Sequence, residues 1–258
     1  MPRMGRRLGQ HFLKPASVER LLRAIAPQPS DVFLEIGPGR GALTLPLAAR
    51  SARVVAVELD GTLARDLAAR APSNVAIVVG DALEIDLSAL VPRGARLVGN
   101  LPYYVSSPLL QRFLDLHARI AVQDLHVMLQ DEVARRIAAR PGSKDYGILS
   151  VLFAAVAETS IPERFTAACF VPAPRVDSAL LHARFLDPPP VRVENQETFE
   201  RLVERAFTHR RKTLENNLQD SYPNLKEYLR FLKIEGTRRA ETLSVGEFVS
   251  LAERLHLE

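Results

Sequence analysis

Cysteine is nearly absent from this 258-residue sequence, and long apolar runs are absent too. The single cysteine, Cys169, excludes an internal disulfide, and with only six histidines in the chain a Cys/His metal cluster is not expected. There is no run of about 18 apolar residues, so we expect no membrane-spanning helix. The Arg-containing start lacks the apolar core of a secretion signal, and we therefore expect a cytoplasmic protein.

The composition is that of a globular protein with a substantial core. Hydrophobic residues make up 47% of the chain, which is enough for one full core and a smaller appended domain. The formal net charge of +4 favours a polyanionic partner only weakly, because a charge this small is common in proteins of this size.

A buried strand, a glycine loop and a helix are predicted in succession near the N-terminus. Residues 32–36 form an apolar run, the loop contains Gly37, Gly39 and Gly41, and residues 42–48 are typical of a helix. Glycine permits positive φ and lets a ligand approach the backbone, while a helix start offers free N–H groups. The spacing is Gly-x-Gly-x-Gly and differs from the Gly-x-Gly-x-x-Gly of pyrophosphate-binding dehydrogenases.

Three further apolar runs lead into polar residues. The run at 53–57 precedes Glu58, the run at 75–79 is followed by Gly80 and Asp81, and the run at 95–99 precedes Asn100. The carboxyl ends of parallel strands meet at one edge of a sheet, where open α/β folds bind ligands. Glu58 is suited to two ribose hydroxyls and Asp81 to an adenine amine. Together these residues predict a nucleoside site, although each alone also fits a turn or a solvated strand end.

The stretch Asn100-Leu101-Pro102-Tyr103 carries the most specific chemistry. The Leu101 carbonyl lacks a following N–H because Pro102 comes next, so it and the Asn100 side-chain oxygen can accept the two hydrogens of an exocyclic amine. Tyr103 offers a face on which a flipped base can stack. A strand-ending turn without any chemistry is the alternative for this stretch considered alone.

These motifs resemble the rRNA adenine N6,N6-dimethyltransferases of the small ribosomal subunit, and the resemblance covers nearly the whole chain. The motifs, in chain order, are LGQHFL at 8–13, EIGPG at 35–39, ELD at 58–60, GDA at 80–82, NLPY at 100–103, MLQDEV at 128–133, YG at 146–147, FVPAPRVDS at 170–178 and RRKTL at 210–214. Two positions depart from the family pattern, with Tyr104 where asparagine is common and Ile148 where arginine often follows the Tyr-Gly pair.

The resemblance implies S-adenosylmethionine as the methyl donor and small-subunit rRNA in an immature ribosomal subunit as the partner. We also expect a monomer that binds no metal and no membrane. It implies a Rossmann-like class I methyltransferase fold, α/β with a mostly parallel seven-stranded sheet, one late antiparallel strand and flanking helices. It also implies that Phe170 closes the other face of the target base. The expected cofactor residues are His11, Leu13, Gly37, Gly39, Glu58, Leu59, Asp81, Ala82 and Asn100.

The C-terminal part reads as a separate helical domain. We place the boundary at Asp187, where a triple proline follows an apolar strand at 179–185, giving domains 1–186 and 187–258. Residues 187–258 carry 12 Lys and Arg against 13 Asp and Glu, so the tail is not a generic basic arm. The cluster Arg210, Arg211 and Lys212 is nevertheless predicted to contact RNA phosphates, as are the N-terminal residues Arg3, Arg6, Arg7 and Lys14. A solvated charged face is the alternative.

The remaining secondary structure is less uniform. Residues 125–129 read as a fifth strand and 131–139 as a helix, while 148–157 fits either helix or strand.

Two other functions are compatible with these motifs. One is an enzyme of the sister group that methylates a large-subunit rRNA adenine and confers antibiotic resistance. The sequence motifs at 170–178 and 210–214 favour the small-subunit group instead. The other is an RNA-binding assembly factor with a vestigial methyltransferase fold, against which the intact Gly37, Glu58, Asp81, Asn100 and Tyr103 argue.

Overall fold

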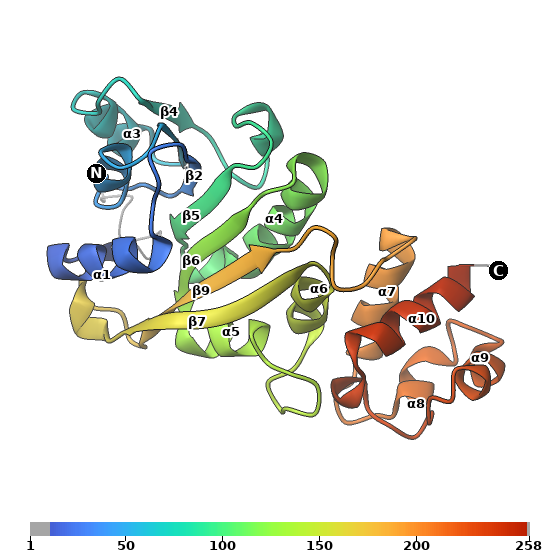
Figure 1. The fold of residues 1–258 in the computed structure, drawn as a ribbon. Helices are drawn as coiled ribbons and strands as arrows, with labels where there is room; N and C mark the ends of the chain where they lie inside the picture. Colours follow the sequence, from blue (N-terminus) through green and yellow to red (C-terminus); the bar gives the residue numbers. More distant parts are fainter. Residues whose placement is uncertain (1–10, 257–258) are drawn as a thin grey trace. The chain divides into compact units, whose positions relative to one another are not determined.

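The computed structural model describes residues 11–256 (Figure 1). The predicted motif residues 8–10 and the basic residues Arg3, Arg6 and Arg7 lie outside the described part of the chain. Within residues 11–256, no helix combines the length and the apolar character that crossing a bilayer requires.

A seven-stranded sheet forms the centre of the fold, in the order β4-β3-β2-β5-β6-β9-β7 (Figure 1). The strands from β4 to β6 in this order pair in parallel, and β9 pairs antiparallel to β6. The expected mostly parallel α/β sheet with one late antiparallel strand is confirmed. Its strands are β2 (Val32–Ile36), β3 (Arg53–Glu58), β4 (Val75–Val79), β5 (Arg96–Asn100), β6 (Asp124–Gln130), β7 (Ala157–Phe165) and β9 (Ser178–Phe185).

Helices follow most of the parallel strands, as the crossover connections of a parallel sheet require. The helices up to residue 156 are α1 (Pro15–Ile25), α2 (Thr44–Ala48), α3 (Gly61–Ala68), η2 (Leu87–Ala89), η3 (Tyr103–Val105), α4 (Ser106–Ile120), α5 (Asp131–Ile137) and α6 (Ile148–Val156). A short separate sheet pairs β1 (Phe12–Leu13) with β8 (Phe170–Val171), which follows η4 (Ala167–Cys169). The C-terminal elements are α7 (Gln196–Ala206), α8 (Leu214–Leu218), α9 (Leu225–Phe231), η5 (Ala240–Thr242) and α10 (Val245–His256).

The segment that fits either helix or strand contains both. Residues Ile148–Val156 form α6, and β7 begins directly at Ala157. The Gly147 N–H donates to Ser150 Oγ at 2.9 Å, which satisfies one free donor at the helix start. Strand β7 lies at the edge of the sheet and its residues alternate between exposed and covered, so Pro162 is tolerated there without loss of a ladder bond in the sheet interior.

The chain divides into two compact units, which we call the sheet unit (residues 11–134 and 160–185) and the helical unit (residues 135–159 and 186–256). Residues 135–159 were expected in the first domain, but in the structure they pack with the C-terminal helices. The physical reason is α6, which is apolar on nearly every face and contacts α7 and α10. A helix of that kind must be buried on several sides.

A buried ion-pair network ties α1 to the sheet. Arg96 Nε donates to Asp124 Oδ1 at 2.9 Å, and its Nη1 donates to Asp31 Oδ2 at 2.6 Å. Its Nη2 donates to the Ile25 carbonyl, in the last turn of α1, at 2.7 Å. A cation at the carbonyl end of a helix is favourable, and every polar group in this network gains a partner. The network therefore fixes the end of α1 over the strands that carry Arg96 and Asp124.

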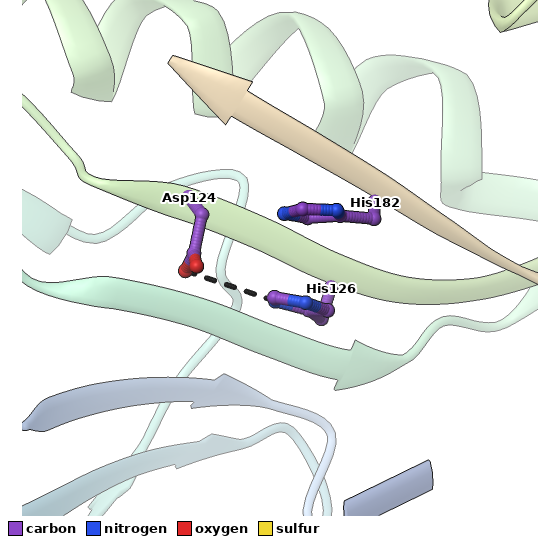
Figure 2. Close-up of side chains that lie close together, drawn as sticks. All are labelled: Asp124, His126 and His182. Carbon is purple, nitrogen blue, oxygen red and sulfur yellow. Dashed lines mark ion pairs between the residues drawn. The ribbon is translucent and has the colours of Figure 1, made fainter. Parts of the chain in front are cut away.

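Two stacked histidines extend this network (Figure 2). His126 on β6 and His182 on β9 lie directly opposite each other, with ring centroids 4.3 Å apart and ring planes 13° from parallel. Burial lowers the pKa of His182 to about 4, and the neighbouring His126, Arg96 and Arg184 act in the same direction while Asp124 opposes them. The folded protein therefore holds His182 neutral at neutral pH.

We expect this histidine to make the fold less stable in mild acid. Its pKa in the folded state lies below the ordinary value of 6.5, so the unfolded chain binds the proton more readily. The part of the free energy of unfolding that depends on neutral His182 is fully present above pH 6.5. It is lost as the pH falls from there toward 4. The variant His182→Phe keeps a ring against His126 but cannot titrate, and its midpoint of thermal unfolding should fall less between pH 7.5 and pH 5 than that of the wild type. The exposed His209→Phe is the matched control, and an equal fall in His182→Phe and wild type would contradict the expectation.

Candidate active site

A cavity opens at the carboxyl ends of β2, β3 and β5 and beside the loop after β4, all within the sheet unit. Nearly all of the predicted cofactor and catalytic residues line it. These are His11, Leu13, Gly37, Gly39, Glu58, Leu59, Asp81, Ala82, Asn100, Leu101, Pro102 and Tyr103. Phe170 and the Arg210–Lys212 cluster are not among the lining residues.

The register of the sheet explains why these residues meet. Ile36 on β2 pairs with Val57 on β3 and with Gly99 on β5, so the residues that follow these strands emerge at the same level. The backbone of Gly99 lies so close to β2 that a Cβ added there would be 2.8 Å from the Ile36 carbonyl oxygen, so this position requires glycine. The glycine loop, Glu58 and Asn100 are thus brought together by strand pairing, as the sequence predicts.

The glycine loop has the backbone that its sequence requires. Gly37 has φ of 70° and Gly39 has φ of 56°, values that residues with a side chain rarely adopt. A Cβ added to Gly39 would also lie only 3.0 Å from the Phe12 ring. The loop therefore presents bare backbone to the cavity, which is what close approach of a ligand needs.

Glu58 connects the glycine loop to the next helix. It is 4% exposed, its Oε2 accepts from the Gly39 N–H at 2.9 Å, and its Oε1 accepts from the Asp60 N–H at 2.9 Å. Asp60 in turn caps α3 by accepting from the Thr62 N–H. A carboxylate has about four lone-pair sites, so these two bonds leave acceptor capacity for two hydroxyl groups. The geometry suits the paired ribose hydroxyls expected from the sequence.

Glu35 is a cavity residue to which the sequence analysis assigns no role. Its side chain is 2% exposed, it lines the cavity, and its Oε2 has no hydrogen-bond partner among the described residues. Burial raises the pKa of Glu35 to about 7, and the nearby Glu58 carboxylate acts in the same direction. An acidic residue inside the otherwise apolar run 32–36 is the signal that identifies it. An unpartnered buried oxygen beside bare glycine backbone fits a polar, partly cationic ligand such as S-adenosylmethionine.

Asn100 is held in one orientation by a hydrogen bond to the segment that begins the described chain. Its Nδ2 donates to the His11 carbonyl at 2.8 Å, and this uses the donor end of the amide. The acceptor end, Oδ1, is thereby left to the cavity that Asn100 lines. Next along the chain, the Leu101 N–H donates to the Met128 carbonyl at 3.3 Å. The Leu101 carbonyl precedes Pro102 and cannot bond to a following N–H.

Tyr103 is fixed from two sides. Its hydroxyl lies 2.8 Å from Ser178 Oγ on β9, and its ring stacks on His11 with centroids 6.0 Å apart. His11 Nδ1 lies 2.8 Å from the Pro172 carbonyl oxygen and so connects this ring pair to the loop after β8. Ser178, quoted in the FVPAPRVDS motif but given no role there, is thus the residue that orients Tyr103.

The expected cofactor residue Asp81 lines the cavity in the loop after β4. Its Oδ1 accepts from the Leu83 N–H at 2.9 Å, which orients the carboxylate within its turn. Leu59 is 51% exposed although it lines the cavity, so its side chain forms part of the mouth.

Phe170 is a core residue and is not among the residues that line the cavity. Its side chain is 2% exposed and belongs to the core cluster that includes Leu13, Val18 and Met128. Pairing of β1 with β8 sets Phe170 opposite Leu13. In this structure the ring supports the cavity wall from behind, and its contact with a base stays a prediction.

The basic cluster at 210–212 divides into two kinds of residue. Arg210 Nη2 donates to the carbonyls of Lys144 and Tyr146 at 2.6 and 2.9 Å, and the guanidinium lies 3.7 Å from Glu241. These contacts are all within the helical unit and give Arg210 a structural role. Arg211 and Lys212 are exposed, so RNA contact is retained as a proposal for these two.

The described residues also place Asp124, His126 and His182 close enough to suggest a metal site. The imidazole lone pairs lie in the ring planes, and the two rings are stacked face to face, so they do not converge on one point (Figure 2). Arg96 already bonds both oxygens of Asp124. This arrangement is that of a structural network, and no ligand set for a metal is formed by it.

Comparison with known proteins gives one consistent result. The family model for ribosomal RNA adenine dimethylases matches residues 2–257. A protein of Geobacter metallireducens named Ribosomal RNA small subunit methyltransferase A is 44% identical over 260 residues, covering 96% of this chain and 94% of that protein.

Two solved structures share the fold over nearly the whole chain. A dimethyladenosine transferase from Plasmodium falciparum has a TM-score of 0.80 at 22% identity and covers 96% of this chain and 98% of its own. The 23S rRNA methyltransferase ErmE has a TM-score of 0.70 at 27% identity, with coverage of 95% and 99%.

Glu58 provides the test of the cofactor half of the cavity. The variant Glu58→Gln keeps the size of the side chain but replaces one acceptor oxygen by a donor, so it should weaken binding of S-adenosylmethionine by about tenfold or more. Glu84→Gln makes the same charge change at an exposed position outside the cavity lining and should bind normally. Isothermal titration calorimetry measures both, and equal affinities in the two variants would remove Glu58 from the site.

Proposed function

The chain belongs to the ribosomal RNA adenine dimethylase family, and on this basis we propose that it dimethylates the N6 atoms of two adjacent adenosines in small-subunit rRNA. It has the class I methyltransferase fold expected from the sequence and is an S-adenosylmethionine-dependent rRNA methyltransferase. The proposed target lies in the loop of the hairpin near the 3′ end of the small-subunit rRNA, and the enzyme acts there on an immature small subunit in the cytoplasm.

The observation that carries the proposal is the orientation of Asn100. Because Nδ2 is bonded to the His11 carbonyl, Oδ1 is available as an acceptor, and the Leu101 carbonyl follows it at once. An adenine amine is a weak nucleophile because its lone pair is delocalised into the ring. Two acceptors that bind both amine hydrogens hold the nitrogen in a geometry that localises the lone pair, and they need no reorganisation during the reaction.

The other cavity residues have distinct proposed roles. S-adenosylmethionine supplies an electrophilic methyl group when bound, and the residues suited to hold it are the glycine loop, Glu58, Asp81 and Leu59. Tyr103, fixed by Ser178 and His11, offers its ring to the target base. A loop target is physically favourable, since single-stranded bases can be splayed out without unpairing a duplex.

Of the two candidate substrates, we propose small-subunit rRNA and not large-subunit rRNA. The relative at 44% identity carries a small-subunit name, while the large-subunit enzyme ErmE is 27% identical. The exposed pair Arg211 and Lys212 supports the RNA-binding part of the proposal.

The proposal is tested by analysing the product. Purified protein and labelled S-adenosylmethionine are incubated in separate reactions with small subunits that lack the modification and with unmodified large-subunit rRNA, and each rRNA is digested and examined by mass spectrometry. N6,N6-dimethyladenosine in small-subunit rRNA is the expected product. Dimethyladenosine found only in large-subunit rRNA would establish the resistance-type activity, and no product in either rRNA despite cofactor binding would favour a vestigial RNA-binding protein.

Asn100→Ala should reduce turnover by about 100-fold or more while rRNA binding is retained, because the lost oxygen acts on the reacting amine. Asn100→Asp keeps an oxygen acceptor but loses the donor to His11, so it separates the acceptor role from the positioning role. Turnover is measured by methyl transfer and binding by gel shift. Unchanged turnover in Asn100→Ala would contradict the mechanism.

The basic cluster is tested separately. The double variant Arg211→Ala/Lys212→Ala should flatten the slope of log Kd for rRNA against log salt concentration by up to about two units. The control Arg192→Ala/Arg201→Ala removes two other exposed charges of the helical unit and should leave the slope unchanged. Arg210→Ala should instead lower the midpoint of thermal unfolding, because its guanidinium bonds two backbone carbonyls. Equal slopes of log Kd against log salt concentration in the two double variants would show that Arg211 and Lys212 belong to a solvated face without RNA contact.

A further inference from the structure

Tyr104 presents an uncovered aromatic face at the cavity. It lines the cavity and is 61% exposed. The other highly exposed aromatic side chain, Phe231, is 63% exposed but lies under the Arg254 guanidinium, 3.9 Å from its ring centroid. Among the described residues none makes a side-chain hydrogen bond, ion pair or ring contact with Tyr104.

The backbone of this turn directs two consecutive tyrosines differently. Tyr103 and Tyr104 belong to the same short helix η3, in which successive side chains point about 120° apart. Tyr103 is directed inward by its contacts with Ser178 and His11. The same turn therefore leaves Tyr104 at the mouth, one residue away from the ring proposed to hold the target base.

The next residues begin helix α4. Helix α4 starts at Ser106, its N-cap Val105 makes no side-chain capping bond, and its first turn contains no acidic residue. Ser107, in this first turn, is exposed. The first N–H groups of a helix favour a negative group, so the phosphate that joins two nucleotides is compatible with the chain just after Tyr104.

We propose that Tyr104 is the stacking platform for the nucleobase adjacent to the target adenine in the single-stranded RNA substrate. The inference rests on the proposed function, because it needs an RNA chain entering the cavity. Extrusion of the target adenine removes a stacking partner from its neighbour in the loop. An exposed aromatic ring beside the inner ring replaces that partner, and it accepts any base, since every base has a π-face.

The chain contains no tryptophan, which allows a direct probe. In Tyr104→Trp the new indole is the single tryptophan, and its fluorescence should be quenched when a synthetic RNA hairpin with two adjacent loop adenosines binds. The same hairpin with an abasic nucleotide on the 5′ or the 3′ side of the target is then compared. Loss of quenching with one of the two abasic hairpins supports the platform, and equal quenching with all three hairpins overturns it.

Affinity gives the second readout. Tyr104→Asn should raise the Kd for the intact hairpin about tenfold, and Tyr104→Phe should stay close to the wild type because the ring is kept. On the abasic hairpin that abolishes quenching, wild type and Tyr104→Asn should bind equally. An equal loss on intact and abasic RNA would overturn the proposal, because the effect would not depend on the neighbouring base.

A last measurement separates the platform from a cofactor lid and from failure of the proposed function. Tyr104→Asn should bind S-adenosylhomocysteine as the wild type does in the absence of RNA, and a weakened affinity would assign Tyr104 to the cofactor and overturn the platform. Kd values need no turnover, so they test Tyr104 even where methyl transfer fails. Absence of methylated product in the wild type would contradict the proposed function. The binding measurements would still test the stacking role of Tyr104.

Discussion

The parallel register of β2, β3, β4 and β5 is the constraint on which the rest of the structure depends. Pairing of these strands in one direction places every strand-to-helix connection at a single edge of the sheet. The glycine loop, Glu58, Asp81 and Asn100 lie far apart in the sequence and share a cavity for this reason alone. Buried apolar strands maintain the register, because a slip would misplace both their side chains and their hydrogen bonds.

Hydrogen bonds fix the orientation of the residues that meet at this edge of the sheet. Glu58 bonds the backbone of Gly39 and of Asp60, so one carboxylate positions both the glycine loop and the start of α3. On the other side, His11 accepts from Asn100 and stacks on Tyr103. The residues proposed to bind the methyl donor and those proposed to bind the target base are thus oriented before any ligand binds. Catalysis by positioned dipoles requires such prior orientation.

The sequence predicted the sheet well because buried parallel strands are continuous apolar runs, and β2 was predicted residue for residue. It also predicted that Gly37, Glu58, Asp81 and Asn100 share the cavity, since each lies at or just after a strand end, whereas His11 and Leu13 were expected from the family resemblance. The segment 148–157 was ambiguous because α6 is apolar on nearly every face, so its sequence shows no helical periodicity.

The sequence could not distinguish Arg210 from Arg211, because a run of like charges does not reveal which guanidinium meets backbone carbonyls. The burial of Phe170 depends on pairing of β8 with β1, a contact between residues more than 150 positions apart. The positions of Glu35 and Tyr104 in the cavity likewise depend on the three-dimensional arrangement of the strands, which the sequence alone does not give.

The central claim is that the Asn100 side-chain oxygen and the Leu101 carbonyl together bind the amine of the target adenine. The most direct measurement is a crystal structure of the protein with S-adenosylhomocysteine and a loop RNA that contains the target adenosine. The account predicts N6 within about 3.2 Å of both Asn100 Oδ1 and the Leu101 oxygen, with the Asn100–His11 bond intact. An adenine bound with N6 away from both oxygens, or an Asn100 amide turned so that Nδ2 faces the base, would contradict it.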